Sequence, residues 1–154
     1  MPVAISEAGI RFPVGYSPWY VYEATLVASP NTFAVMDVLT PAAGLFDKSE
    51  SAGDITLLNG YVFALEAYFV GMTSLQVAVP GSLVPLVAGA AIQPEGLVKI
   101  VIGADPFPQT VQAALVADFT AGQAIGRYRN QNTDAQNLRA AAADDIIYVL
   151  SGVA

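Results

Sequence analysis

The stretch LQVAVPGSLVPLVAGAAI, residues 75–92, decides whether this apolar chain is expected to form a membrane-spanning helix or short strands. A helix that spans a membrane needs about 20 consecutive, predominantly apolar residues. This stretch is nearly long enough, but Pro80, Pro85 and Gly89 interrupt it. Proline lacks a backbone donor and breaks a helix interior, and glycine marks turns. The stretch therefore favours short strands with turns between them over a membrane-spanning helix.

The composition of the whole chain raises the question of where its apolar surface goes. Hydrophobic residues make up 55% of the chain and charged residues only 12%, against a usual charged share of roughly 25%. The other apolar run, residues 61–72, contains Glu66 and is too short to cross a bilayer. We therefore expect the surplus apolar surface to be buried in protein–protein interfaces, whose centres are apolar and aromatic.

Missing residue types narrow the function. The chain has 154 residues, a usual size for one domain or for one domain with an arm, and it contains neither cysteine nor histidine. Disulfides, thiolate metal sites, and Ser–His and Cys–His nucleophile pairs are therefore excluded within one chain. We expect no enzymatic activity, no cofactor and no metal. The competing class is an acid-based hydrolase with two facing carboxylates, which needs no histidine.

The charge balance narrows the partners. Thirteen acidic and six basic residues give a net charge of −7. Nucleic-acid binding depends on neutralising phosphates with Lys and Arg, and an anionic membrane surface repels an acidic protein in the same way. We therefore expect no nucleic acid and no membrane as partners, but another protein whose surface is basic or mainly apolar.

Short apolar segments bounded by turn residues recur along the chain. Segments rich in β-branched and aromatic residues are typical of strands, and many short ones in succession indicate a barrel or a sandwich. The strand candidates are residues 19–28, 32–39, 54–58, 61–70, 75–79, 97–102, 111–116, 124–128 and 146–151, with Ile92 as an isolated one. We predict a mainly antiparallel all-β fold: a small β-barrel, a β-tulip-like domain or a sandwich.

Turn signals suggest how the middle of the chain is connected. Asn59-Gly60 predicts a tight hairpin between residues 54–58 and 61–70, because both residues tolerate positive φ. The polar run within residues 45–53 predicts a solvated loop. These two features would place a surface loop before the hairpin.

The C-terminal part carries weaker local signals. An N-cap candidate followed by alanines predicts one or two helical turns in residues 134–143. Asp144-Asp145 predicts a turn before the last strand, because neighbouring carboxylates on a strand would point to opposite faces. No sequence repeat of fixed period is apparent.

Residues 1–30 differ from residues 31–154, which we expect to form the β-rich domain. Four prolines punctuate these first thirty residues, yet aromatic and apolar side chains are frequent among them. The segment is either an extended arm that docks on a neighbouring subunit or partner, or the first strand of the protein's own core. In the arm interpretation the large apolar and aromatic side chains make the contact. These candidate contact residues are Ile10, Phe12, Tyr16, Trp19 and Tyr20.

Two patterns suggest a ligand site. Asp47, Ser49, Ser51 and Asp54 alternate oxygen atoms as calcium loops do, but the glycine and bidentate glutamate of such loops are missing. A solvated loop is the preferred interpretation. An aromatic pair two residues apart, at positions 20 and 22, shares one face of a strand and could form a sugar-binding platform. Packing in the core or in an interface is preferred there, with a carbohydrate-binding β module as the alternative.

The C-terminal half resembles a known family. In VAGAAIQPEGLVKI, residues 87–100, a turn of small residues leads into a G-x-L-V-K strand. An alanine-containing segment, residues 111–118, and AIGRY, residues 124–128, follow, and AAAADDIIYVLS, residues 140–151, closes the chain. The order and approximate spacing of these motifs, over about 65 residues, are similar to those of head decoration (cement) proteins of tailed bacteriophages.

The resemblance implies a structural protein of the virion. Its expected core is a small β-barrel or β-tulip, and its expected state is a homotrimer clamped to the outer surface of the capsid, which it stabilises. The implied partner is the major capsid protein, and the implied location is the capsid exterior after assembly in the host cytoplasm. Residues 1–80 are longer than in the smallest family members. Another virion component, a major capsid or tail protein, is therefore the alternative.

Overall fold

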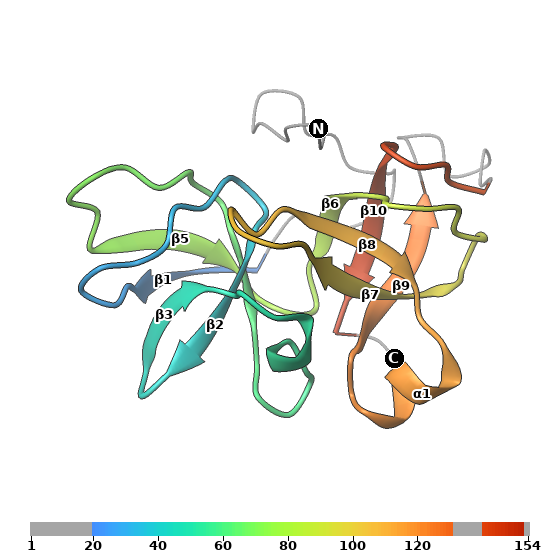
Figure 1. Cartoon of the computed structure of the whole chain (residues 1–154), viewed down its shortest axis with the longest axis horizontal. Coiled ribbons are helices and arrows are strands. Elements are labelled where there is room, and N and C mark those ends of the chain that lie inside the picture. The colour runs from blue at the N-terminus through green and yellow to red at the C-terminus, as the bar shows by residue number, and fades with distance from the viewer. Residues whose placement is uncertain (1–19, 131–139, 153–154) are drawn as a thin grey trace.

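The computed structural model describes residues 20–130 and 140–152, and nearly all regular structure in them is β (Figure 1). One 3-10 turn, η2 (Ala52–Asp54), and one short helix, α1 (Val116–Thr120), interrupt the strands. The strands are β1 (Val21–Thr25), β2 (Val38–Ala42), β3 (Leu45–Lys48), β4 (Val62–Ala64), β5 (Ser74–Ala78), β6 (Leu83–Val87), β7 (Leu97–Ile102), β8 (Gln109–Ala113), β9 (Ala124–Asn130) and β10 (Ile146–Ser151). The predicted all-β fold is confirmed.

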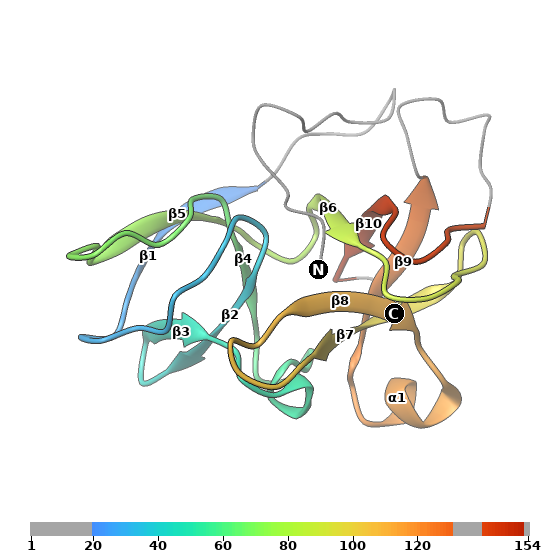
Figure 2. The same cartoon turned by 45° about the horizontal axis from the view of Figure 1, so that its top comes forward.

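The strands form two antiparallel sheets of five, in the orders β1-β5-β4-β2-β3 and β6-β10-β9-β7-β8. Each sheet curls until its two edge strands approach each other. A parallel bridge joins these edges, Leu26 with Phe46 in the sheet of β1 and β3, and Ala88 with Val111 in the sheet of β6 and β8. We call the two nearly closed sheets barrel A (β1–β5) and barrel B (β6–β10). Figures 1 and 2 show them side by side, with the β7–β8 hairpin reaching toward barrel A.

The two barrels have the same topology. Adding five to each strand number of barrel A reproduces the strand order of barrel B. The hydrogen bonds repeat as well. In barrel A the Met36 N–H donates to the Ala64 carbonyl at 2.6 Å, and in barrel B the Glu95 N–H donates to the Tyr128 carbonyl at 3.0 Å. The chain is therefore a structural repeat in its backbone pairing, although its sequence shows no periodic signal.

The repeated register gives each residue of one barrel a counterpart in the other. On β2 and β4, Val38 pairs with Phe63. On β7 and β9, Leu97 pairs with Arg127. The hydrogen bond that closes each barrel lies at the same register. In barrel A the Val27 N–H donates to the Phe46 carbonyl, and in barrel B the Gly89 N–H donates to the Val111 carbonyl. Equivalent positions can therefore be compared directly.

Two cores hold the molecule together. One fills barrel A with residues such as Leu39, Val62 and Val77. The other fills barrel B and extends across the junction to the outer side of barrel A, including Val38 and Phe63. Successive residues of a strand face opposite sides, so β2 and β4 contribute alternately to the core of barrel A and to the contact with barrel B.

Strand β6 was absent from the predicted strands because Pro85 lies in its middle. The Ser151 N–H donates to the Ser82 carbonyl and the Ala88 N–H to the Asp145 carbonyl. Antiparallel bonding alternates along a strand, so even-numbered residues of β6 bond to β10. The nitrogen of Pro85 therefore faces the seam between β6 and β8, where a missing N–H leaves no ladder bond unmade.

The prediction of a solvated loop over residues 45–53 was wrong in its first half. Residues 45–48 form β3, and Lys48 and Ser49 are buried. The polar side chains are tolerated because each has a partner: Lys48 Nζ lies 2.9 Å from Asp37 Oδ2, and Ser49 Oγ donates to the Ser51 carbonyl. A polar composition alone therefore did not mark exposure.

The predicted hairpin around Asn59-Gly60 was also wrong. Gly60 does adopt positive φ, but the bond from its N–H reaches the Thr56 carbonyl in a turn that has no preceding strand. The two-residue hairpin lies instead between β2 and β3, where Ala43 and Gly44 have φ of 51° and 81°. The strands next to this turn pair with each other, and β4 pairs with β2 and β5.

Two predicted strands are displaced. The strand expected over residues 32–39 begins only at Val38, because Phe33 is buried in a loop and Met36 has a φ of 70°. The strand expected over residues 111–116 ends at Ala113, before α1.

Other predictions are confirmed. The strands over residues 97–102 and 146–151 match β7 and β10, and a turn at residues 143–144 precedes β10. Strands also form within residues 19–28, 75–79 and 124–128, with small shifts of their ends, and Ile92 forms an isolated bridge with Ala141. The helical turn predicted over residues 134–143 lies largely outside the described residues.

Candidate interaction surfaces

Of the predicted contact residues, only Tyr20 lies within the described part of the chain. Ile10, Phe12, Tyr16 and Trp19 lie outside it. The Tyr20 side chain is 59% exposed, while its backbone is fixed: its N–H donates to Ser82 Oγ at 2.9 Å, and its carbonyl accepts from the Val79 N–H at 2.9 Å. Tyr20 therefore presents an accessible ring from a rigid position at the start of β1.

The second aromatic residue of the proposed sugar platform, Tyr22, lies two residues along β1. Its ring contacts Phe46 edge-on, with 6.5 Å between the ring centroids. Phe46 in turn packs against the core of barrel A. Partial burial raises the pKa of the Tyr22 phenol. Tyr22 is therefore tied to the barrel, and Tyr20 offers the more accessible ring of the pair.

The largest group of exposed apolar side chains lies at the ends of two equivalent connections, between β3 and β4 and between β8 and β9. The connections contact each other, since the Leu57 N–H donates to the Gly122 carbonyl at 3.0 Å. Both lie at the lower end of Figure 1. Leu58 and Val116 are 93% and 84% exposed. We call this group the loop-end surface; its members are Leu57, Leu58, Leu115, Val116 and Phe119.

Polar contacts hold α1 in place while its apolar side chains remain outside. Asp118 Oδ2 accepts from the Leu115 N–H at 2.7 Å and lies 3.0 Å from Lys99 Nζ. The Leu115 N–H, and then Lys99, lower the pKa of the Asp118 carboxyl. The exposed side chains of α1 are thus presented by an anchored element.

The sequence holds one signal for the loop-end surface. Leu57 and Leu58 are consecutive and directly precede the Asn59-Gly60 turn. Two neighbouring residues of an extended chain cannot both face one core. Val116 has no such signal, because it follows a run whose residues favour a strand up to that position.

A second, smaller pair of exposed apolar side chains lies in the β4–β5 connection. Phe69 and Val70 are both largely exposed. In Figure 1 this connection lies at the upper left, away from α1. It offers a natural comparison for tests of the loop-end surface.

A polar pocket of about 430 Å³ lies beside the β2–β3 hairpin. Three residues of the pattern that resembles a calcium loop, Asp47, Ser49 and Asp54, line this pocket. Its lining residues are Thr40, Pro41, Ala42, Asp47, Lys48, Ser49, Glu50, Asp54 and Asn59. Because Asp47 Oδ1 accepts from the N–H groups of Asn31 and Lys48, and Ser51 Oγ accepts from the Gly53 N–H to cap η2, these oxygens serve local structure. In residues 20–130 and 140–152, no three acidic side chains gather as a metal site would require.

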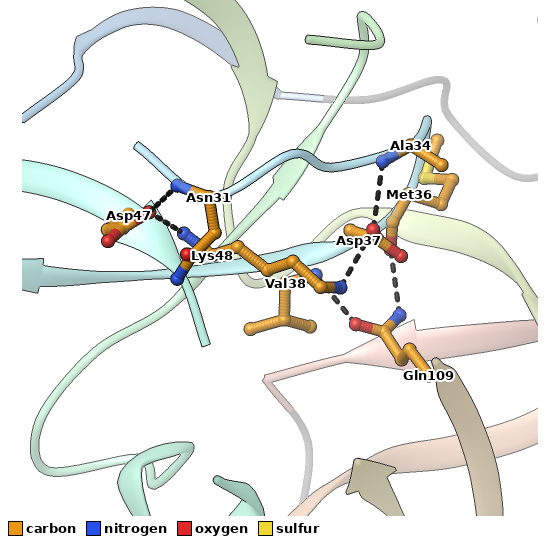
Figure 3. A network of polar contacts seen from close by, with 8 residues as sticks. All are labelled: Asn31, Ala34, Met36, Asp37, Val38, Asp47, Lys48 and Gln109. Atoms are coloured by element: carbon orange, nitrogen blue, oxygen red, sulfur yellow. Dashed lines mark hydrogen bonds and ion pairs between the residues drawn. The ribbon is translucent and has the colours of Figure 1, made fainter. Parts of the chain in front are cut away.

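Figure 3 shows the polar network that includes Asp47 and Lys48, two residues of the pocket lining. The Lys48 side chain runs to Asp37, whose Oδ2 also accepts from the Ala34 N–H at 2.8 Å. From barrel B, Gln109 Oε1 accepts from the Val38 N–H at 2.7 Å, and its Nε2 donates to the Met36 carbonyl at 2.9 Å. One side chain of barrel B therefore completes the backbone bonding at the start of β2.

Tyr61 makes the second polar link between the barrels. Its hydroxyl donates to the Ile125 carbonyl of barrel B at 3.1 Å. Burial raises the pKa of Tyr61 to about 12, although the Gly152 N–H lowers it slightly. The neutral phenol is therefore the form that the junction holds.

Charge is distributed unequally between the barrels. Within residues 20–79, six acidic side chains accompany one base, the buried Lys48. The three other bases of the described chain, Lys99, Arg127 and Arg129, lie on β7 and β9 of barrel B. Arg127 donates to the Glu95 carbonyl, and Arg129 pairs with the Glu95 carboxylate. Barrel A thus has an excess of acidic side chains, and the bases of barrel B lie together on β7 and β9, where Lys99 and Arg129 form ion pairs with Asp118 and Glu95.

Comparison of the chain with protein-family models, curated proteins and solved structures yields no match. No helix of the described residues has the length and apolar character needed to cross a bilayer.

Proposed function

We propose that the protein is a non-catalytic assembly protein, namely a head decoration protein that binds the outer surface of a tailed-phage capsid and stabilises it. The observation that carries the proposal is the loop-end surface. Its apolar side chains lie outside two barrels whose cores are already filled. Exposed apolar groups gathered in one place mark interaction sites on soluble proteins.

The sequence resemblance supports the same proposal. Three of its motifs, GLVK, AIGRY and the closing segment, fall on β7, β9 and β10. These strands are neighbours in barrel B. The additional length of the chain relative to small family members is taken up by barrel A, which has the same topology.

The proposed partners are the major capsid protein and further copies of this chain, assembled as a homotrimer. The location is the capsid exterior. Residues Ile10, Phe12, Tyr16, Trp19 and Tyr20 are proposed to add contacts with the capsid or a neighbouring subunit. Because the loop-end surface is apolar, its binding should depend only weakly on salt.

The test measures binding to expanded capsids made from the major capsid protein of the same genome. Leu58→Asp combined with Val116→Asp should reduce binding about tenfold or more, because charges would be buried in an apolar contact. Phe69→Asp combined with Val70→Asp is the matched control and should bind as the parent chain does. Equal binding by all three proteins would remove the loop-end surface from the proposal, and an absence of binding by the parent chain would refute the decoration function.

A further inference from the structure

The contact between the barrels uses different surfaces of the repeated unit. Barrel A contributes the start of β2 and the outer side of β4, with Val38 and Phe63 completely buried. Barrel B contributes the β7–β8 hairpin end, where Ile102 packs against the shared core and Gln109 bonds to β2. Such a contact is heterologous, because the two partners do not present the same patch.

A heterologous contact between repeated units leaves one copy of each surface unused. The barrel B counterparts of Val38 and Phe63 are Leu97 and Arg127, which remain half-buried. We call them, with Lys99 and Arg129 on the same strands, the free face. The barrel A counterpart of the β7–β8 hairpin end is the β2–β3 hairpin, whose residues 41–45 are exposed. We call this hairpin the free end.

The two unused surfaces also differ in charge. On the free face, Lys99 and Arg129 form ion pairs with Asp118 and Glu95, and Arg127 donates to the Glu95 backbone carbonyl, so Arg127 is the base whose charge a partner can meet. The free end borders the pocket lined by Asp47, Glu50 and Asp54. Oppositely charged patches steer association and fix the register of an interface. A second copy of the chain can therefore offer what each unused surface lacks.

We propose that copies of this chain associate head to tail, with the free face of barrel B on the free end of barrel A in the next copy. The arrangement repeats between chains the contact that joins the two barrels within one chain. A heterologous contact of this kind closes into a ring when its rotation divides a full turn. The inference rests on the proposed assembly function, in which the chain acts as an oligomer, and specifies the surfaces that meet.

Reciprocal charge reversal tests the geometry. Arg127→Glu and Asp54→Arg should each weaken self-association about tenfold or more in sedimentation velocity. An equimolar mixture of the two variants should recover association in part, because each mixed contact pairs either two native or two reversed residues, whereas a ring of three keeps one mismatched contact. Glu23→Arg, an exposed acid on β1, is the matched control and should associate like the parent chain. A parent chain that stays monomeric, or single variants that associate normally, would overturn the proposal.

Cysteine cross-linking gives a second readout that does not depend on charge. The chain has no cysteine of its own. Leu97→Cys and Ala42→Cys should form a disulfide-linked dimer when the two variants are mixed under oxidation, and neither should do so alone. Cross-linking of one variant with itself would show an isologous contact and contradict the proposal. Self-association that persists when the loop-end variants lose capsid binding would separate this inference from the capsid-binding function.

Discussion

Barrel A and barrel B share strand order and register but fill equivalent positions with different side chains. At one inward pair, barrel A has Ala64 and Phe46, whereas barrel B has Tyr128 and Val111. Ala64 of barrel A is smaller than its counterpart Tyr128 in barrel B. Phe46 of barrel A is larger than its counterpart Val111. Cores tolerate such exchanges when total volume and patterning are kept. The comparison shows that patterning and pairing, more than residue identity, define this unit.

The outer faces of the barrels differ more than their cores. Val38 and Phe63 on barrel A are apolar and completely buried, while their counterparts Leu97 and Arg127 include a charge and remain half-buried. The difference corresponds to the contact between the two barrels, which covers Val38 and Phe63 but not their counterparts. The face that is covered within the chain is apolar, and the face that is open carries a charged residue.

The largest expected effect comes from the equivalent pair Phe63 and Arg127. Phe63→Ala should lower the free energy of unfolding by about 3–5 kcal/mol, because it removes a fully buried ring from the junction. Arg127→Ala should cost about 1 kcal/mol or less, since it removes one hydrogen bond from a half-buried side chain. Urea denaturation of both variants measures the difference. Similar losses of unfolding free energy in the two variants would mean that Phe63 and Arg127 contribute equally to stability, and would contradict the difference between the two faces.

Much of this fold was accessible from the sequence, and the reasons for the failures are specific. The β-branched and aromatic runs located β7 and β10 because their apolar residues are bounded by turns. The strongest turn signal, Asn59-Gly60, did not form a hairpin, because the preceding segment bonds to the other barrel through Leu57. The actual hairpin turn, Ala43-Gly44, has the glycine of such turns but lacks the asparagine or aspartate that makes the signal strong. Local propensity here yielded to tertiary contacts.

The candidate surfaces were less accessible. The expectation of surplus apolar surface came from composition alone, and the contact residues it named lie in the N-terminal segment, where Tyr20 is the one of the five that the structure describes. The two connections that carry Leu58 and Val116 meet at the bond from the Leu57 N–H to the Gly122 carbonyl. That meeting depends on the structural repeat, which has no periodic sequence signal. The free face and the free end could be recognised only by comparing registers.

The second prediction concerns Tyr61, whose counterpart in barrel B, Ile125, cannot titrate. The pKa of Tyr61 is raised from 10.0 to about 12 by burial, so the folded state favours the neutral phenol. The corresponding stabilisation, about 3 kcal/mol, is fully present below pH 10 and is lost as pH rises toward 12. Urea denaturation at increasing pH should show this decline in the parent chain. Tyr61→Phe should start about 1 kcal/mol lower and decline less steeply; parallel curves would contradict the assignment.

The smallest expected effect tests the polar part of the junction through Gln109. Its counterpart by register is Gly44, at the tip of the free end, which has no side chain to bond with. Gln109→Ala should cost about 1–2 kcal/mol, because the Val38 N–H and the Met36 carbonyl lose their partner.

Gln109→Glu separates the two bonds that Gln109 makes. At neutral pH the carboxylate can still accept from the Val38 N–H but cannot donate to the Met36 carbonyl, and two acceptors then face each other. The variant should therefore be less stable than the parent chain at pH 7 and recover part of the loss at acid pH, where the protonated carboxyl can donate. Urea denaturation at both pH values, referred to the parent chain at each, measures this recovery. If Gln109→Glu were as stable as the parent chain at pH 7, the donor bond to Met36 would contribute nothing to the junction, and the bond from the Val38 N–H, the Tyr61–Ile125 bond and the apolar packing around Phe63 would hold the two barrels together.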